Sequence, residues 1–390
     1  MTTLRAPVLP VILAGAAILL VVHTLGRFIY TPLLPWLVGD GMLTLQQGAS
    51  IASCNYLGYL TGALLAIRWH RIPQIRRCLP WGLVLHVITT LLQTQTTDPT
   101  WLGVLRFLNG ISNGLVFVQA PALILEWLAR QGQAAASGLV YLGVGSGLLL
   151  SSTMVSFSAD WLHGAARWWP AALVSLPLAV WGWRTLSQLE PAEHTPHATT
   201  QTVSGQLIDR STLPLFLSYA GAGMGYILPM TFLPMLARLQ LPADSPLVGG
   251  SWLIVALATL AAPFLWNRAG GLFGDKKALF INYLIQLAGV LAALLLPGAW
   301  GIVLCALLVG STFLGTVLLT QRLGRSLQPH QGPRLSAALI ALYSVAQLAG
   351  PWLTSQWLAA GGSLHSAFWL GAGALCWGFV WMFGVPQPKA

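Results

Sequence analysis

Two arginines lie inside long apolar stretches of the sequence, where charged side chains are rare. Arg27 falls within the apolar run 9–36, and Arg106 falls within the run 101–129. A charge in hydrocarbon is costly, so such residues usually face a bundle interior and serve an ion, a polar solute or a neighbouring helix. The two arginines therefore predict either binding of an anionic or polar substrate, or a structural tie to backbone carbonyls of another helix.

Polar side chains accompany both arginines at helical spacing. His23 precedes Arg27 by four residues and Tyr30 follows it by three, so a helix would place all three on one face. Further polar positions of this kind are Asn109 and Asn113 beside Arg106, and Asn55, Tyr56 and Tyr59 in the run 46–68. If these faces converge, they form a cationic, hydrogen-bonding substrate site. Contacts between helices would explain the asparagines equally well.

Proton coupling has few candidates in this sequence. All nine acidic residues fall at the ends of apolar runs or in loops, and Glu126 is the most deeply placed of them. His23 is the titratable group nearest the expected cationic face, and a histidine ordinarily changes charge near physiological pH. We expect His23 or Glu126 to carry any coupling proton.

Apolar runs recur along the whole chain. Of its 390 residues, 56% are hydrophobic and 7% are charged, whereas soluble domains carry about 25% charged residues. A run of about 20 apolar residues spans the hydrocarbon of a bilayer. We predict an all-α membrane protein with twelve transmembrane helices, near 9–36, 46–68, 77–93, 101–129, 135–157, 167–187, 211–237, 247–267, 277–296, 300–323, 335–358 and 364–384.

Several local signals support the predicted helix ends. Thr44 and Gln47 have the spacing of a capping box. Prolines stand just before three of the spans, where they are tolerated: Pro99, Pro246 and Pro333. Tryptophans near the span ends predict an interfacial belt: Trp36, Trp69, Trp101, Trp127, Trp168, Trp169, Trp266 and Trp300.

The basic residues between the runs predict the orientation. With the N-terminus in the cytoplasm, the outside loops hold only Arg167 and Arg238. The inside loops and tails hold fifteen: Arg5, Arg68, Arg71, Arg76, Arg77, Arg130, Arg184, Arg210, Arg268, Lys276, Lys277, Arg322, Arg325, Arg334 and Lys389. This positive-inside bias favours cytoplasmic termini, and one missed helix would scramble it. The net charge of +10 thus indicates topology and not nucleic-acid binding.

One long polar connection divides the chain. The segment 188–210 is rich in Thr and Gln, and we interpret its His194 and His197 as part of a solvated linker, not as metal ligands. Span seven repeats span one at an offset of 199 residues, with Gly225, Leu233, Pro234 and Leu236 matching Gly26, Leu34, Pro35 and Leu37. We predict two pseudo-symmetric six-helix bundles, 1–187 and 211–390, with a substrate site between them.

The second half offers neutral polar and aromatic side chains in its spans. Tyr226 takes the place of Arg27 in the repeat, and Tyr343 and Gln347 lie in the run 335–358. We expect all three to contact substrate. Basic groups in one half and aromatic groups in the other suit an amphipathic organic anion, although a neutral or zwitterionic solute would also be compatible.

Several short stretches resemble a known family. Gly26-Arg27-Phe28-Ile29-Tyr30-Thr31-Pro32-Leu33-Leu34-Pro35, together with Ala52-Ser53-Cys54-Asn55-Tyr56-Leu57-Gly58-Tyr59 and Gly62-Ala63, is similar to the bacterial YbfB/YjiJ-type branch of the major facilitator superfamily. Arg106-Phe107-Leu108-Asn109-Gly110 resembles the span-four motif of that superfamily, and Tyr343-Ser344 through Gly350-Pro351 resembles span eleven. The resemblance implies a twelve-helix fold and transport by alternating access, and it implies little about the substrate.

The sequence departs from the superfamily pattern after span two. The usual loop there carries an aspartate about four residues after its first glycine, but Ala66 stands at that place after Gly62. The loop after span eight keeps a loose version with Asn267, Arg268 and Asp275. The usual gating contact between aspartate and arginine is therefore not expected in the first half.

The preferred function is secondary active transport of a small organic solute in the bacterial cytoplasmic membrane, with protons as the candidate coupling ion. Alternatives are a multidrug-type exporter of amphiphiles and a non-transporting receptor or scaffold. An intramembrane enzyme would need paired carboxylates, a Ser/His/Asp set or clustered metal ligands, and no such pattern is found. We expect no cofactor, no metal and no nucleic-acid partner, and a monomer whose partners are its substrate and the lipid bilayer.

Overall fold

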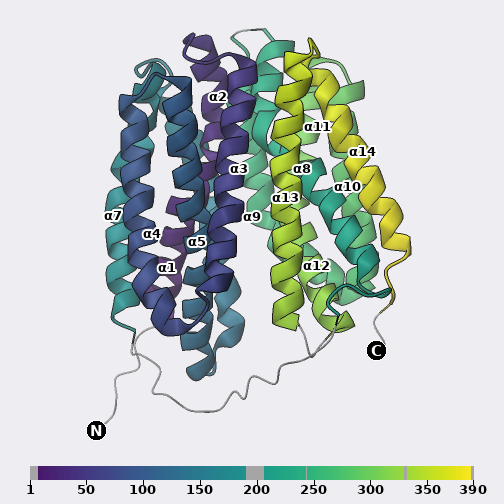
Figure 1. Ribbon diagram of the computed structural model, residues 1–390. Coiled ribbons are helices and arrows are strands. Elements are labelled where there is room, and N and C mark those ends of the chain that lie inside the picture. Colours follow the sequence, from purple (N-terminus) through teal and green to yellow (C-terminus); the bar gives the residue numbers. More distant parts are fainter. Residues whose placement is uncertain (1–7, 190–205, 243, 329–331, 388–390) are drawn as a thin grey trace. The chain divides into compact units, whose positions relative to one another are not determined.

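The computed structural model describes residues 8–189, 206–242, 244–328 and 332–387 (Figure 1). All regular secondary structure in these ranges is helical. The predicted linker histidines His194 and His197 lie outside the described residues, as do the terminal cations Arg5 and Lys389.

The chain forms two compact units. The first comprises Met1–Met42 and Leu57–Ala192, and the second comprises Leu43–Tyr56 and Glu193–Ala390. The boundary at 192–193 falls in the segment 188–210. The units differ from the predicted division in one place, because the first part of the second span groups with the second unit.

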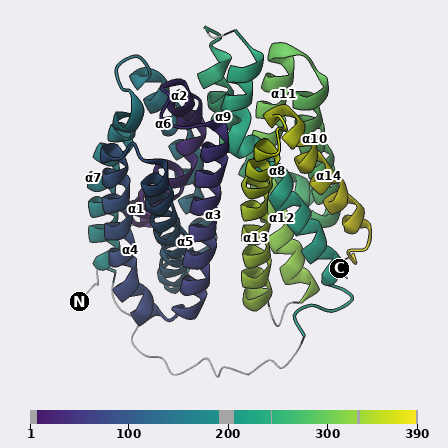
Figure 2. The ribbon, with the colours of Figure 1, turned by 45° about the horizontal axis from the view of Figure 1, so that its top comes forward.

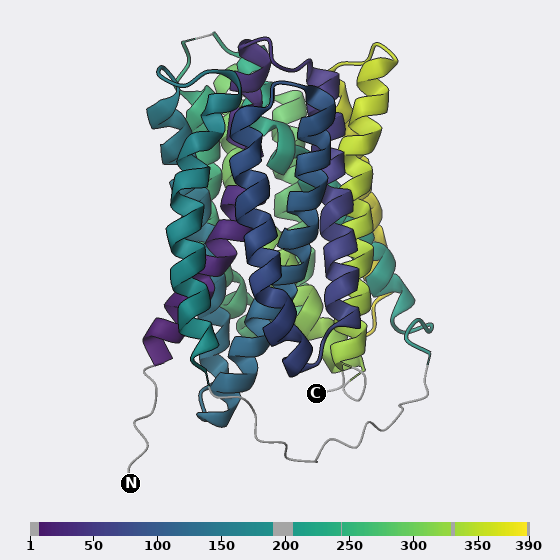
Figure 3. The ribbon, with the colours of Figure 1, turned by 60° about the vertical axis from the view of Figure 1, so that its left-hand side comes forward.

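Before the linker, the helices follow the predicted order. They are α1 (Val8–Leu19), η1 (Leu20–Phe28), α2 (Tyr30–Gly39), α3 (Leu45–Arg68), α4 (Ile72–Leu92), η2 (Gln93–Gln95), α5 (Pro99–Arg130), η3 (Ala134–Tyr141), α6 (Leu142–Ser158), η4 (Gly164–Trp168) and α7 (Trp169–Ser187). In the first unit, α4 and α5 run side by side (Figure 3).

Beyond the linker, seven helices form six spans. They are α8 (Leu213–Gln240), α9 (Leu247–Phe273), α10 (Asp275–Leu295), α11 (Gly298–Gly310), α12 (Phe313–Leu327), α13 (Gly332–Ala359) and α14 (Leu364–Phe383). Helix α8 packs against both α13 and α14 (Figure 2).

The twelve-helix prediction is confirmed. Eleven spans in the described part of the chain are long and apolar enough to cross a membrane, and α7, with 19 residues, is the remaining helix of the twelve. The predicted capping box is also present, since the Thr44 N–H donates to Gln47 Oε1 over 2.8 Å and the Gln47 N–H donates to Thr44 Oγ over 3.2 Å. Pro99 begins α5 behind an Asp98 N-cap.

The predicted tryptophan belt is partly wrong. Trp101 and Trp300 are exposed, as side chains facing lipid would be, but Trp127, Trp168 and Trp266 are buried. Trp266 donates from its indole nitrogen to the Ser311 carbonyl over 2.6 Å. An indole carries a polar N–H on a large apolar body, so it can serve a buried carbonyl as well as an interface.

Two spans are interrupted near their middle. In span one, the π-helical segment η1 connects α1 to α2. In span ten, Ser311 and Thr312 separate α11 from α12, and side chains from neighbouring helices donate to the carbonyls at the break: Thr259 to Gly310, Trp266 to Ser311 and Asn282 to Thr312. Backbone groups at membrane depth must find partners inside the protein, and these bonds supply them.

Corresponding polar contacts recur in the two units, and the equivalent side chains are 200 residues apart. His86 Nδ1 contacts Ser112 Oγ at 2.9 Å in the first unit, and Gln286 Nε2 donates to Thr312 Oγ1 over 3.2 Å in the second. Arg76 donates to the Leu189 carbonyl behind α7 over 2.6 Å. Its counterpart Lys276 donates to the carbonyl of Val385, behind α14. These pairs support an internal repeat.

Asp209 fixes the start of α8. Its carboxylate accepts from the Ser211 hydroxyl at 2.6 Å and from the Thr212 N–H at 2.9 Å, and Gln328 donates to its other oxygen over 3.1 Å. The bond from the Ser211 hydroxyl is the largest cause that lowers the pKa of Asp209 to about 2.

Glycines allow α3 and α5 to approach each other closely. A Cβ added at Gly62 would overlap the Ile111 carbonyl oxygen and lie 2.8 Å from the backbone nitrogen of Leu115. A Cβ at Gly114 would in turn overlap the Tyr59 carbonyl oxygen. Small residues spaced by four let membrane helices pack backbone to backbone.

We predict that Gly62→Ala destabilises the protein by about 1–3 kcal/mol, because the added methyl group must push two backbones apart. Gly373→Ala is the matched control, since a Cβ at Gly373 in α14 meets nothing within 4 Å. Thermal unfolding in detergent measures both. Equal unfolding temperatures for the two variants would contradict the close packing.

Candidate functional site

A cationic and aromatic cluster lies in the first unit around η1. The Arg27 guanidinium carbon lies 4.4 Å from the centroid of the Tyr59 ring, and the His23 ring lies 6.0 Å from the same ring. His23 also stacks on Phe117 at 4.1 Å, and its Nδ1 contacts Asn113 Oδ1 at 3.2 Å. The side chains are buried, with Arg27 only 3% exposed. The structure thus brings together His23, Arg27, Tyr59 and Asn113.

Arg106 binds the backbone of span one. Its guanidinium donates to the carbonyl of Gly26 and, over 3.1 Å, to the carbonyl of Arg27. The same group lies 4.9 Å from the centroid of the Tyr30 ring and 5.6 Å from that of Trp168. Arg106 is 1% exposed. Arg106 therefore links α5 to span one, which is the structural role that the sequence allowed as an alternative to substrate binding.

The main chain of span one loses a donor close to the place where Arg106 binds. The Ile29 N–H donates to the Thr24 carbonyl over 2.8 Å and also reaches the Arg27 carbonyl, and the Leu33 N–H donates to the Ile29 carbonyl over 3.1 Å. Pro32 has no N–H to offer. The guanidinium of Arg106 supplies donors to the carbonyls of Gly26 and Arg27 in this stretch.

Asn109 ties α5 to α4. Its amide nitrogen donates to the hydroxyls of Thr89 and Thr90, each over 3.1 Å. This contact agrees with the alternative interpretation of the asparagines, in which they link helices and do not bind substrate. Along one stripe of α5, Arg106 therefore serves span one, Asn109 serves span three and Asn113 contacts His23.

Two further candidates of the first unit have contacts of their own. The Tyr30 ring stacks on Trp168 at 6.3 Å. The π-helical segment has wider i→i+5 hydrogen bonding, so residues beyond it are turned relative to a regular helix. Glu126 is 32% exposed and pairs with Arg130 one turn along α5, so its carboxylate lies near a helix end and beside a cation.

The candidate residues of the second unit form a separate aromatic group. The Tyr343 ring stacks on Tyr219 at 4.2 Å and on Tyr226 at 5.4 Å, and Tyr226 stacks on Phe313 at 5.6 Å. Gln347 donates to the Tyr226 hydroxyl over 2.5 Å. Of the two candidates in the first part of α3, Asn55 is buried, and the Tyr56 hydroxyl bonds to the Thr231 hydroxyl at 2.8 Å.

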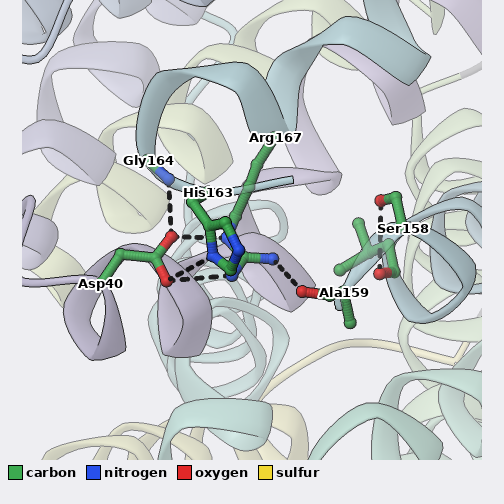
Figure 4. A network of polar contacts seen from close by, with 7 residues as sticks. Asp40, Ser158, Ala159, His163, Gly164 and Arg167 are labelled. Carbon is green, nitrogen blue, oxygen red and sulfur yellow. Dashed lines mark hydrogen bonds and ion pairs between the residues drawn. The ribbon is translucent and has the colours of Figure 1, made fainter. Parts of the chain in front are cut away.

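An ion pair fixes the end of span one. Arg167, from the predicted loop between spans five and six, donates to both carboxylate oxygens of Asp40 over 2.6 and 2.9 Å, and a third donor reaches the Ala159 carbonyl (Figure 4). The Gly164 N–H also donates to Asp40 over 2.6 Å. The bonds from Arg167, and then that from Gly164, hold the pKa of Asp40 below its usual value. Bidentate pairing of this kind is strong and directional.

Sequence reasoning missed three contributors to the site. Phe117 forms the stacking surface under His23, Trp168 lies against Arg106, and His86 is fully buried beside Gly26. The partners of these residues lie on other helices, so spacing within one helix carries no signal of the contacts. Among the described residues, no three His, Cys, Asp or Glu side chains gather as they would around a metal ion.

We predict that Asp40→Asn destabilises the protein at neutral pH by about 2 kcal/mol, because an amide cannot replace the charge-assisted bonds to Arg167. The pKa of Asp40 is lower in the folded protein than in the unfolded chain. The stabilisation is therefore complete above the unfolded pKa and disappears as the pH falls through the folded pKa. The gap in unfolding temperature between wild type and variant should narrow in acid.

The matched control is Asp160→Asn, which removes an exposed carboxylate from the connection between α6 and η4. It should leave the unfolding temperature unchanged. A gap for Asp40→Asn that stays constant from neutral to acid pH would contradict the role of the ion pair.

Comparison with known proteins identifies the family. The family model described as "Uncharacterised MFS-type transporter YbfB", MFS denoting the major facilitator superfamily, matches residues 19–382. No curated protein sequence matches the chain. Three solved structures are similar along nearly their whole length: a D-xylose-proton symporter (TM-score 0.75, 15% identity, covering 98% of this chain and 99% of that one), the POT family transporter PepTSo (0.74, 12%, 97% and 98%) and the nucleoside transporter NupG (0.71, 14%, 97% and 98%).

At these identities the solved structures establish the fold alone, and the family model establishes the relationship. Both agree with the resemblance of the motifs in spans one, two and four. The chain therefore belongs to the YbfB-type family of transporters within the major facilitator superfamily, and it is a multi-pass membrane protein.

Proposed function

We propose that this transporter moves a small organic solute that is anionic or amphipathic. The observation that carries the proposal is the buried cluster of His23, Arg27 and Tyr59 around the π-helical segment of span one. Discontinuous helices with irregular backbone often form substrate sites in transporters. Membership of the family supports secondary transport, and the buried positive charge of Arg27 in the cluster supports a negatively charged solute.

The energetics of Arg27 favour an anionic solute. The Arg27 guanidinium lies over the rings of Phe28 and Tyr59, and cation–π contacts of this kind contribute about 0.5–2 kcal/mol. A carboxylate or phosphate group on the solute would add charge-assisted hydrogen bonds to Arg27. Tyr59, His23 and Asn113 would then orient the solute through their polar atoms.

The other candidate residues have less direct roles. Arg106, Tyr30 and Asn109 hold the helices that carry the cluster, and we propose that they act on substrate through this arrangement. In the second unit, we propose Asn55, Tyr56, Tyr226, Tyr343 and Gln347 as substrate contacts. Their aromatic and neutral character suits the apolar part of an amphipathic solute.

Further properties follow as proposals from the sequence. The distribution of basic residues supports cytoplasmic termini and a bacterial cytoplasmic membrane. We also propose that the protein acts as a monomer, without a cofactor, and that it is not an enzyme. Export of amphiphilic compounds is the second candidate function, because the buried rings of Tyr219, Tyr226 and Tyr343 stack on one another, and aromatic faces suit amphiphilic solutes.

We predict that organic anions raise the unfolding temperature of the purified protein in a panel of metabolites and drugs, and that neutral analogues do so less. Arg27→Ala should weaken binding of a stabilising anion by at least tenfold, or about 1.4 kcal/mol. Arg184→Ala, which removes an exposed arginine near the end of α7, is the matched control. Affinity that persists unchanged in both Arg27→Ala and Arg106→Ala would exclude the cationic site.

Proton coupling is proposed for His23 or Glu126. With an anion from the panel as substrate, an inward pH gradient should drive its uptake into proteoliposomes, and either His23→Ala or Glu126→Gln should abolish this dependence. His23 is favoured by its place beside Arg27. If both variants retain pH-driven uptake, the coupling group is elsewhere.

A further inference from the structure

Three exposed arginines surround the short connection between α3 and α4. Arg68 is the last residue of α3, Arg71 is the N-cap of α4, and Arg77 lies in the second turn of α4. Among the described residues, none of the three forms an ion pair with an acidic side chain. Three positive charges therefore stand uncompensated within ten residues of the chain. We call them the α3–α4 arginines.

Hydrogen bonds hold the backbone between the α3–α4 arginines in a defined shape. Gln119, from the neighbouring helix α5, donates to the carbonyl of Trp69 over 3.1 Å. The Arg71 N–H donates to Gln74 Oε1 in the first turn of α4 over 3.3 Å. The arginines thus extend from a connection that is anchored on both sides, which distinguishes them from charges on a loose tail.

Two of the arginines stand at the ends of exposed apolar stripes. On α4, Trp81 and Val84 follow Arg77 at helical spacing, and Trp81 is 70% exposed. On α3, Leu64 precedes Arg68 by four residues and is 50% exposed. Exposed apolar side chains on a membrane-spanning helix face the acyl chains, and a cation at the end of the helix reaches the headgroups. Each stripe therefore combines a surface for acyl chains with a positive charge at headgroup level.

The equivalent loop of the second unit carries its own counter-charge. Asp275 begins α10 and pairs with Arg322 at 3.2 Å. The residue 200 positions earlier is Ile75, which is buried in α4. The sequence between Asp40 and Asp98 contains no acidic residue at all. An anion that comes from outside the protein can supply in the first unit the charge that Asp275 supplies in the second.

We propose that the α3–α4 arginines bind the headgroup of an anionic phospholipid. The phosphate oxygens would accept charge-assisted, bidentate bonds from the guanidinium groups. The acyl chains would lie along the stripes that contain Trp81 and Leu64, which a free phosphate would leave unused. Each basic residue near the surface strengthens the attraction to anionic lipid about fivefold. This site goes beyond the proposed function, because it involves neither the transported solute nor the cluster around Arg27.

The test is native mass spectrometry of the full-length protein in detergent, titrated with phosphatidylglycerol or with phosphatidylcholine that has the same acyl chains. The wild-type protein should bind the anionic lipid at least about tenfold more tightly than the zwitterionic one. Inorganic phosphate in tenfold excess over the lipid should not displace it, because phosphate lacks the acyl chains that the stripes accommodate.

The variant Arg68→Gln/Arg71→Gln/Arg77→Gln should bind phosphatidylglycerol at least about tenfold more weakly than the wild type. Its binding of phosphatidylcholine should be unchanged, which checks that the variant folds. Replacing the same three residues with lysine should retain most of the binding, because the positive charges remain.

The matched control is Arg268→Gln/Lys277→Gln/Arg325→Gln, which removes three exposed basic residues from the second unit and changes the net charge equally. It should change the affinity for phosphatidylglycerol less than about twofold, since these charges lie outside the site. An equal loss in both variants would overturn the proposal in favour of a general effect of charge.

Two further results would overturn the proposal. One is a wild-type protein that binds both lipids equally well. The other is displacement of phosphatidylglycerol by inorganic phosphate, which would make the arginines a site for small anions. The anion-binding test of the proposed function depends on Arg27 and needs no added lipid, so failure of either test leaves the other proposal standing.

Discussion

The bond from Arg106 to the carbonyls of Gly26 and Arg27 is the contact on which the arrangement of the first unit depends. A backbone carbonyl inside a membrane protein cannot be left to water, so an interrupted span requires donors from a neighbouring helix. Arg106 meets this requirement with a rigid, bidentate group that stays charged at any physiological pH. The same break turns His23 and Arg27 toward Tyr59, and it brings Gly26 against His86.

The second unit meets the same constraint with different chemistry. The break in span ten is served by Thr259, Trp266 and Asn282, all neutral donors. Neutral donors satisfy carbonyls without the desolvation cost of a buried charge. Backbone satisfaction therefore does not by itself demand an arginine, and the buried arginines of the described residues, Arg27, Arg106 and Arg167, all belong to the first unit. This distribution agrees with a function for positive charge in that unit, which is the basis of the proposed anionic solute.

The sequence predicts the helices better than their interior. Apolar length and loop charge establish twelve spans, and the capping box of Thr44 and Gln47 is present as predicted. The apolar pattern does not reveal the change from α to π pairing in span one, although Pro32 follows the π-helical segment closely. The contacts of His86 and Trp168 escape sequence analysis because their partners, Ser112 and Arg106, lie on other spans.

A cryo-electron microscopy structure of the Arg106→Leu variant in nanodiscs would test the central claim most directly. The account predicts that residues 20–28 lose the π-helical conformation or become poorly ordered, and that His23 and Arg27 leave the Tyr59 ring. The wild-type protein prepared in the same lipid is the reference. An unchanged segment in the variant, with both side chains still against Tyr59, would contradict the claim that Arg106 holds the break.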